Sequence, residues 1–165
     1  SYAHLTYYSG VSPCSDTAPT GLDHRYIYQL RARTPNGESG YYYSSYVAAS
    51  SYIYSRPSPP STLTIAWQVQ DATVRRTWTR GGTYASDVDI DREDNDDTTW
   101  DDVGANLAIG VGYQDDAAPT GSDHKYEYRA RCGVLGGQGG DVWGSTFTYS
   151  SPIYSPPATM TSASP

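Results

Sequence analysis

A run of carboxylates between residues 87 and 102 is the most concentrated group of reactive side chains in the sequence. It holds nine of the chain's 18 acidic residues: Asp87, Asp89, Asp91, Glu93, Asp94, Asp96, Asp97, Asp101 and Asp102. Carboxylate oxygens are ligands that calcium prefers, and the first four of these residues form the candidate metal site. The spacing departs from the EF-hand loop, because Arg92 stands where that loop needs a glycine for its tight turn.

The same segment also fits a β-strand, which gives the carboxylates a second interpretation. Alternation along a strand puts Val88 and Ile90 on one face and Asp87, Asp89 and Asp91 on the other. If the apolar pair faces a core, the acids face solvent and keep the strand from pairing with a foreign sheet edge. From the sequence, calcium ligation and a solvated acidic strand are both open.

Two histidines at equivalent places raise the question of acid–base chemistry. His24 follows Asp23 and His124 follows Asp123, each just before a tyrosine-containing segment. This position in a turn favours a structural role, in which hydrogen bonds fix the loop. His4 is isolated, and the sequence holds neither a Gly-x-Ser-x-Gly motif nor histidines at metal-binding spacing. We therefore expect no catalytic residues, no cofactor and no enzymatic activity.

The two cysteines, Cys14 and Cys132, are too few for a zinc site of four cysteines or for a disulfide-dense scaffold. Cys132 follows Tyr126 and Tyr128 at two-residue spacing, so we expect it on the same strand face as a buried, inert thiol. Cys14 lies in a loop. A disulfide between Cys14 and Cys132 would have to cross domains or chains, and it stays an alternative.

Composition limits both the partners and the fold class. The formal net charge of -7 argues against nucleic-acid binding, which needs a basic surface. No apolar stretch reaches the roughly 20 residues that span a membrane. The chain has 17 Tyr against one Phe and is rich in Ser, Thr, Gly and Pro, which favours strands and turns. It starts at Ser1 without Met or a signal-peptide pattern, which we interpret as a processed or excised piece of a longer precursor.

An internal repeat with an offset of 100 residues organises the chain. The segment Ala18-Pro19-Thr20-Gly21, followed by Asp23-His24, recurs as Ala118-Pro119-Thr120-Gly121, followed by Asp123-His124. The same offset carries Ile53-Tyr54-Ser55 onto Ile153-Tyr154-Ser155, and a fainter echo relates 59–64 to 156–161. We therefore expect the last part of one repeat in residues 1–57, a complete repeat in 58–157, and a linker or the first strand of another repeat in 158–165.

The complete repeat predicts a β-sandwich of seven short strands. These strands are expected near residues 63–67, 74–78, 84–92, 98–103, 106–113, 124–132 and 143–149. Residues 1–57 correspond only to the last three strands, which are too few to bury two sheet faces. The missing strands must come from an upstream stretch of the same polypeptide or from another molecule.

The order of the motifs gives a family resemblance. A Leu-x-Ile strand after Pro-Pro, a strand that closes on Trp78, a Pro-x-Gly turn and a strand with Tyr126 and Tyr128 follow one another. This order resembles tandem fibronectin type III-like, immunoglobulin-like β-sandwich repeats. The resemblance implies a core that contains Trp78, Tyr126 and Tyr128, with Tyr126 at the tyrosine-corner position. Arg76 departs from the pattern, because alternation turns it toward that core, so either its strand contains a bulge or Arg76 finds a partner.

The linkers at 55–62 and 155–159 combine prolines with hydroxyl side chains and are expected to act as semi-rigid spacers. Their Ser-Pro-Pro pieces resemble the hydroxyproline-rich glycoproteins of algae and plants. The candidate positions for O-glycosylation are Ser58, Pro59, Pro60, Ser61, Thr62, Pro156, Pro157 and Thr159. Bare spacers are the alternative. The sequence has no Asn-x-Ser/Thr sequon, so N-glycosylation is not expected.

These features predict a structural role at the cell surface or outside the cell. A head-to-tail contact that does not close on itself generates a filament, so we expect a filament or fibre subunit whose partners are copies of itself and glycans. The repeats join either covalently or by donated strands. The alternative is a carbohydrate-binding or adhesive module of a larger secreted protein, because Tyr41–Tyr43 and the tyrosines that follow exceed what one strand face can hide. A window of a long multidomain protein that forms no fibre is also open.

Overall fold

The computed structural model describes residues 21–35, 40–49, 51–69, 72–95, 97–117, 121–137 and 140–158. Within these ranges every regular secondary-structure element is a β-strand, so the expected all-β fold is confirmed. A search of the same residues finds no helix long and apolar enough to cross a membrane.

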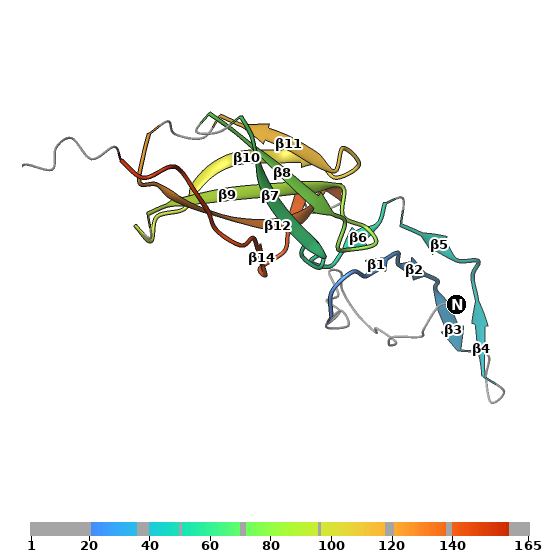
Figure 1. The fold of residues 1–165 in the computed structure, drawn as a ribbon. Helices are drawn as coiled ribbons and strands as arrows, with labels where there is room; N and C mark the ends of the chain where they lie inside the picture. The colour runs from blue at the N-terminus through green and yellow to red at the C-terminus, as the bar shows by residue number, and fades with distance from the viewer. Residues whose placement is uncertain are drawn as a thin grey trace, which may run out of the picture.

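Residues 62–154 form a β-sandwich of two antiparallel sheets (Figure 1). The smaller sheet has the order β11-β8-β7, with β7 at Thr62–Val69, β8 at Thr73–Thr79 and β11 at Tyr113–Asp116. The larger sheet has the order β10-β9-β12-β13, with β9 at Asp87–Asp94, β10 at Asp101–Ala108, β12 at Lys125–Gly137 and β13 at Gly140–Trp143. The short strands β14 (Thr148–Tyr149) and β15 (Ile153–Tyr154) also pair with β12.

The preceding segment forms an amino-terminal hairpin that projects from one end of the sandwich (Figure 1). Its three antiparallel pairs join β1 (Arg25–Tyr26) to β6 (Ile53–Tyr54), β2 (Gln29–Leu30) to β5 (Val47–Ala48), and β3 (Arg33–Pro35) to β4 (Tyr41–Tyr43). The pair Arg25–Tyr54 at its base repeats the pair Lys125–Tyr154 of the sandwich. Only the middle of the hairpin differs in strand register, since Gln29 pairs with Ala48 whereas Arg129 pairs with Tyr149. The hairpin thus reproduces the β12–β15 part of the sandwich at the offset of 100 residues.

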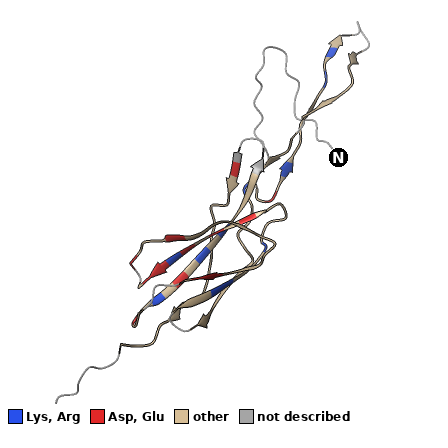
Figure 2. Cartoon of the chain, turned by 90° about the horizontal axis from the view of Figure 1, so that it is seen from above, with Lys and Arg blue, Asp and Glu red and all other residues tan. Residues whose placement is uncertain are grey.

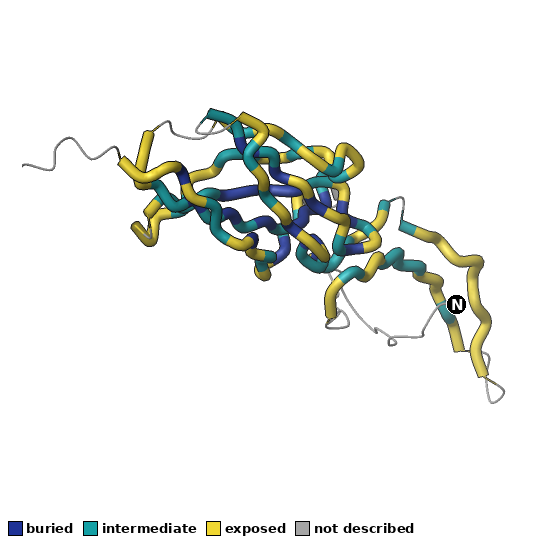
Figure 3. Tube along the Cα trace, viewed as in Figure 1, coloured by how far each residue is buried: buried dark blue, intermediate teal, exposed yellow. Residues whose placement is uncertain are grey.

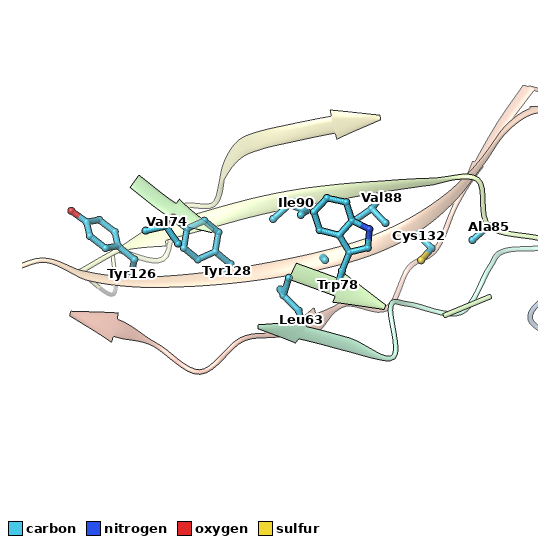
Figure 4. Close-up of a cluster of buried hydrophobic side chains, with 10 residues drawn as sticks. Leu63, Val74, Trp78, Ala85, Val88, Ile90, Tyr126, Tyr128 and Cys132 are labelled. Carbon is cyan, nitrogen blue, oxygen red and sulfur yellow. The ribbon is translucent and has the colours of Figure 1, made fainter. Parts of the chain in front are cut away.

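The core lies between the two sheets of the sandwich (Figures 3 and 4). Two-residue alternation sends apolar side chains inward from both sheets, and Trp78, Tyr126 and Tyr128 are 4%, 0% and 0% exposed. The other buried members of this cluster are Leu63, Val74, Ala85, Val88, Ile90, Ala130 and Cys132. The ring of Trp67 meets Tyr126 edge-on, with 6.0 Å between centroids, and closes the cluster at that end.

Two of the expected strands are displaced in the structure. In place of strands near 98–103 and 106–113, a single strand β10 covers Asp101–Ala108 and β11 follows at Tyr113–Asp116. The pairing of β10 with β9 shifts register between Gly104 and Leu107, where Asn106 has a positive φ of 53°. A β-bulge of this kind bends a strand without ending it, and an alternating pattern does not reveal it.

Arg76 keeps its place on the inner face and is stabilised there by partners. Pairing of β7 with β8 is regular from Thr62 to Trp67, so β8 does not bulge at Arg76. The Arg76 side chain is 1% exposed, and its guanidinium donates to the Val103 carbonyl at 3.0 Å and to Gln114 Oε1 at 2.8 Å. Burial lowers the pKa of Arg76, and the nearby Asp116 carboxylate opposes this change. Of the two sequence-based alternatives, the partner is the one observed.

Asp116 supplies the negative charge of this buried polar group. It accepts hydrogen bonds from the Tyr128 hydroxyl at 3.0 Å and from Arg92 Nη1 at 2.8 Å. Burial, reinforced by Asp116, raises the pKa of Tyr128, so the phenol keeps its proton and remains a donor. Because Asp116 belongs to the smaller sheet while Arg92 and Tyr128 belong to the larger one, these bonds tie the two sheets together.

Replacing Asp116 tests this assignment. Asp116→Ala leaves the Arg92 guanidinium and the Tyr128 hydroxyl without their common acceptor and removes the negative charge nearest Arg76, and we expect a loss of roughly 3 kcal/mol in the free energy of unfolding. Urea titration of the full chain measures the change. The matched control is Asp115→Ala, since Asp115 pairs with Arg75 on the solvent side of the same strand and should contribute little. Equal losses for the two variants would contradict the proposed role of Asp116.

Candidate functional site

The Asp-His turn of the first repeat is fixed by hydrogen bonds between His24 and Ser55. Asp23 has a positive φ of 62°, and the His24 amide donates to Ser55 Oγ at 2.8 Å, while the Ser55 amide returns a bond to the His24 carbonyl at 3.0 Å. A side chain at Gly21 would begin 2.9 Å from His24 Nε2, so glycine lets the turn close over the imidazole. These bonds hold the end of the hairpin to its beginning.

The second repeat builds the same turn. Asp123 has a φ of 62°, the His124 amide donates to Ser155 Oγ at 2.8 Å, and a side chain at Gly121 would begin 2.9 Å from His124 Nε2. The His124 ring stacks on Tyr126, with 5.6 Å between centroids and 4° between planes, and its Nδ1 lies 2.9 Å from Asp94 Oδ1. The two histidines therefore have the structural role that their place in a turn favours.

The aspartate of each turn holds the linker as it leaves the repeat. The Asp23 amide donates to the Arg56 carbonyl at 3.0 Å, and Asp23 Oδ1 accepts the Ser58 amide at 3.0 Å. The Ser58 hydroxyl also donates to Asp23 Oδ2. In the second repeat Asp123 Oδ1 accepts the Ala158 amide at 3.0 Å. The carboxylate thus fixes the direction in which the chain exits.

Two glycines let the sandwich approach this linker closely. A Cβ on Gly82 would lie 2.0 Å from Asp23 Oδ1 and 3.1 Å from Pro57 Cβ. A Cβ on Gly81 would lie 1.6 Å from the Pro59 carbonyl oxygen. At position 81 only glycine fits, because the clash would be with backbone, and at position 82 a Cβ would have to displace the Asp23 carboxylate. Pro57 is consequently buried between the hairpin and the sandwich.

Aromatic contacts also join the hairpin to the sandwich. We call the region where the linker, hairpin and sandwich meet the junction. The rings of Tyr54 and Tyr84 lie 5.9 Å apart between centroids at 58°. The Arg25 guanidinium stands 4.1 Å from the Tyr52 ring centroid and 5.1 Å from that of Tyr84, so the cation lies between one ring of each repeat. Hydrogen bonds, glycine contacts and cation–π contacts together set the relative orientation of the two repeats.

Comparisons with known proteins bear on the fold. No family model and no curated protein matches the chain. Similar solved structures include the FN1–FN3 domains of chicken CNTN1, with 20% identity over 61% of this chain and 33% of that chain and a TM-score of 0.49. They also include a fragment of successive titin domains, with 16% identity over 79% of this chain and 40% of that chain and a TM-score of 0.48.

A single titin module from human cardiac muscle is similar as well, with 16% identity over 58% of this chain and 89% of that chain and a TM-score of 0.42. The match to the multidomain fragments spans less than half of their length. The two packed sheets and the partial copy of the sandwich in the hairpin show an all-β fold of tandem β-sandwich repeats.

In this sandwich two carboxylates of β9, those of Asp89 and Asp91, are buried rather than solvated. Asp89 and Asp91 are only 7% and 9% exposed, because β9 lies inside its sheet and the register places Arg131 and Arg129 of β12 opposite them. Acidic and basic stretches lie on the strands of the sandwich (Figure 2). Arg131 donates to Asp89 Oδ2 at 2.8 and 2.6 Å, and Arg129 donates to Asp91 Oδ2 at 2.7 Å. The expectation of a solvated strand at a sheet edge was wrong.

The side chains of the four candidate metal ligands do not converge on one point. Alternate residues of a strand are about 7 Å apart, so Asp87, Asp89, Asp91 and Glu93 form a row along β9 rather than a cage. The described carboxylates that lie within 4.8 Å of one another are Asp89, Asp91 and, from the neighbouring β10, Asp102. Arginines bind two of these three, and calcium binding along this row stays a prediction.

The candidate glycan positions differ in accessibility. Pro60 is less than 2% exposed and its carbonyl accepts a hydrogen bond from Thr148, so the packing of the fold removes Pro60 from the candidates. The Ser58 hydroxyl is engaged by Asp23, and Pro59 packs beneath Gly81. Thr159 lies outside the described residues. The exposed candidates are Ser61, Thr62, Pro156 and Pro157.

Cys132 lies in the core, with its side chain beneath the glycine pair of the junction. It is 0% exposed, and burial raises the pKa of its thiol, which keeps the sulfur protonated and unreactive. Cys14 lies outside the described residues, so a disulfide between the two cysteines stays a prediction.

The glycine contacts at the junction lead to a specific expectation for Gly82→Ala. The new Cβ must displace the Asp23 carboxylate from the Ser58 amide, and we expect hydrogen exchange of that amide to accelerate by a factor of about 10 or more. Exchange measured by NMR on the full chain gives the result. The control is Gly110→Ala, where a Cβ meets no described atom within 4 Å. Unchanged exchange at Ser58 in Gly82→Ala would show that the glycine contact does not hold the linker.

The pair of Asp89 and Arg131 gives a pH-dependent expectation. Burial raises the pKa of Asp89, and pairing with Arg131 opposes that rise. An acid with a raised folded-state pKa binds its proton more tightly when folded, so its cost to stability decreases as pH falls through that pKa. Arg131→Ala should therefore cost roughly 2 kcal/mol near pH 7 and clearly less near pH 4.

Urea titration of Arg131→Ala at the two pH values measures this difference. Adding Asp89→Asn in the same chain removes the titrating carboxyl and should abolish the difference. A loss that is the same at both pH values in the single variant would contradict the assignment.

Proposed function

We propose that this chain is a structural subunit of an extracellular filament or surface fibre, assembled head to tail from β-sandwich repeats and carrying O-linked glycans on its linkers. The observation that carries the proposal is the inner face of the amino-terminal hairpin, which no described residue covers. On that face Leu30 is 70% exposed, whereas its equivalent in the sandwich, Ala130, is 0% exposed. Val47 and Ile53 of the same hairpin are 64% and 41% exposed.

The sandwich indicates what belongs on this face. In the complete repeat the equivalent strand β12 is covered by β7 and β8, whose Leu63, Val74 and Trp78 are buried against it. Within the described residues the hairpin has no such cover. In this proposal strands equivalent to β7, β8 and β9 complete the first repeat, either from the same polypeptide or donated by another molecule.

The ends of the molecule support a linear arrangement. The hairpin leaves the sandwich at one end, and the described chain exits at the opposite end (Figure 1). Both repeats point the same way, since the base pairs Arg25–Tyr54 and Lys125–Tyr154 are equivalent and each lies at the exit of its repeat. A contact between unlike ends that repeats in one direction generates a fibre rather than a closed oligomer.

The tyrosines of the hairpin favour assembly over sugar binding. The Arg31 guanidinium stands 3.9 Å from the Tyr43 ring centroid and 4.7 Å from that of Tyr46, and Arg33 stands 4.2 Å from that of Tyr41. One face of each of these rings therefore has a cation over it and is not free for a stacked sugar.

Electron microscopy of the native material tests the proposal. We expect regular fibres with an axial repeat the size of one sandwich, because each repeat adds to the previous one with the same geometry. Discrete particles that bind a glycan saturably would contradict the proposal and support an accessory binding module.

A variant pair locates the contact in the same experiment. Leu30→Asp places a charge on the uncovered face and should reduce self-association of the chain in sedimentation measurements. Val69→Asp makes a similar change at another exposed apolar site, 58% exposed on the sandwich, and should leave association unchanged. Equal effects of the two substitutions would show that the hairpin face is not the site of assembly.

A further inference from the structure

The far end of the sandwich carries a surface that no described residue covers. Its pocket of about 370 Å³ is lined by Asp123, His124, Lys125, Tyr154, Ser155 and Pro157. We define the exit surface as Asp123, Lys125, Tyr154 and Pro157. Tyr154 is 62% exposed, and Asp123 and Pro157 are also exposed.

The exit surface is the counterpart of a surface that is covered elsewhere in the same chain. At the offset of 100 residues its four members match Asp23, Arg25, Tyr54 and Pro57. At the junction, Gly82 packs on the Asp23 carboxylate and on Pro57, and Tyr84 packs on Tyr54 and Arg25. Pro57 is consequently less than 2% exposed.

We infer that the exit surface binds the Gly-Gly-x-Tyr loop of a further β-sandwich repeat, in the geometry of the first junction. The second glycine of that loop would lie on the Asp123 carboxylate, and the tyrosine would pack on the Tyr154 ring beside the Lys125 ammonium. This inference deepens the proposed function and rests on it in one respect, namely that further repeats join this chain.

The backbone of the exit surface is already arranged for this partner. Asp123 has the same φ of 62° as Asp23, and the amide of Ala158 donates to Asp123 Oδ1 at 3.0 Å as Ser58 does to Asp23. Lys125 supplies a cation where Arg25 stands, which preserves a cation–π contact with a tyrosine. Little reorganisation is therefore needed for binding.

The same geometry excludes some occupants. The first junction requires glycine at position 81, where a Cβ would lie 1.6 Å from the Pro59 carbonyl oxygen, and a Cβ at position 82 would displace the Asp23 carboxylate. The loop 81–84 of this chain is already bound to its own hairpin, so a second identical chain cannot offer that loop without opening its own junction. The occupant is therefore the corresponding loop of an additional repeat.

An extended chain tests the inference. Residues 1–158 are followed directly by a second copy of 59–165, so that the appended repeat enters at the position where Pro59 follows Ser58. We expect hydrogen exchange of the Ala158 amide to slow by a factor of about 10 or more relative to the 165-residue chain, approaching the rate of Ser58. Unchanged exchange at Ala158 would overturn the inference.

Two variants of the extended chain provide the controls. Tyr154→Ala removes an exposed ring and leaves the core intact, and Gly82→Val in the appended copy alone obstructs the carboxylate contact. Each should return Ala158 to its faster exchange rate, and retention of slow exchange in both would contradict the assigned contacts. Fibres without protection of Ala158 would refute this inference alone, whereas protection without fibres in the native material would refute only the proposed function.

Discussion

The hydrogen bonds between the Asp23 carboxylate and Ser58 are the constraint on which the arrangement of the two repeats depends. They turn a proline-rich linker, which by composition is a spacer, into a fixed part of the junction. The positive φ of Asp23 directs its carboxylate to the departing chain, and glycine at position 82 leaves room for the sandwich beside it. The orientation of one repeat relative to the next therefore depends on a few specific hydrogen bonds, glycine contacts and aromatic contacts.

The interior of the sandwich reflects a similar use of polar contacts. A chain with many tyrosines and few aliphatic residues cannot fill a core with hydrocarbon alone, and the Arg76 guanidinium occupies space between the sheets. Its position is acceptable because Gln114 and the Val103 carbonyl accept its hydrogen bonds and Asp116 lies nearby. On the outer face, Arg129 and Arg131 similarly neutralise the acids of β9.

Much of the fold follows from sequence patterns, and the exceptions have identifiable physical causes. The repeat of 100 residues, the turn role of His24 and His124 and the inward alternation around Trp78 are local or periodic signals. The burial of Asp89 is not local, because it depends on which strand lies beside β9. The junction glycines were missed for another reason: their equivalents fall outside the sequence, so comparison of the repeats does not mark them.

Nitrogen-15 relaxation of backbone amides in the intact chain shows whether the linker contacts make the hairpin and the sandwich one rigid unit, since it reports rotational motion at each residue. We expect the amides of β1–β6 and of β7–β15 to fit one anisotropic tumbling tensor. Separate and faster tumbling of the hairpin would contradict this expectation.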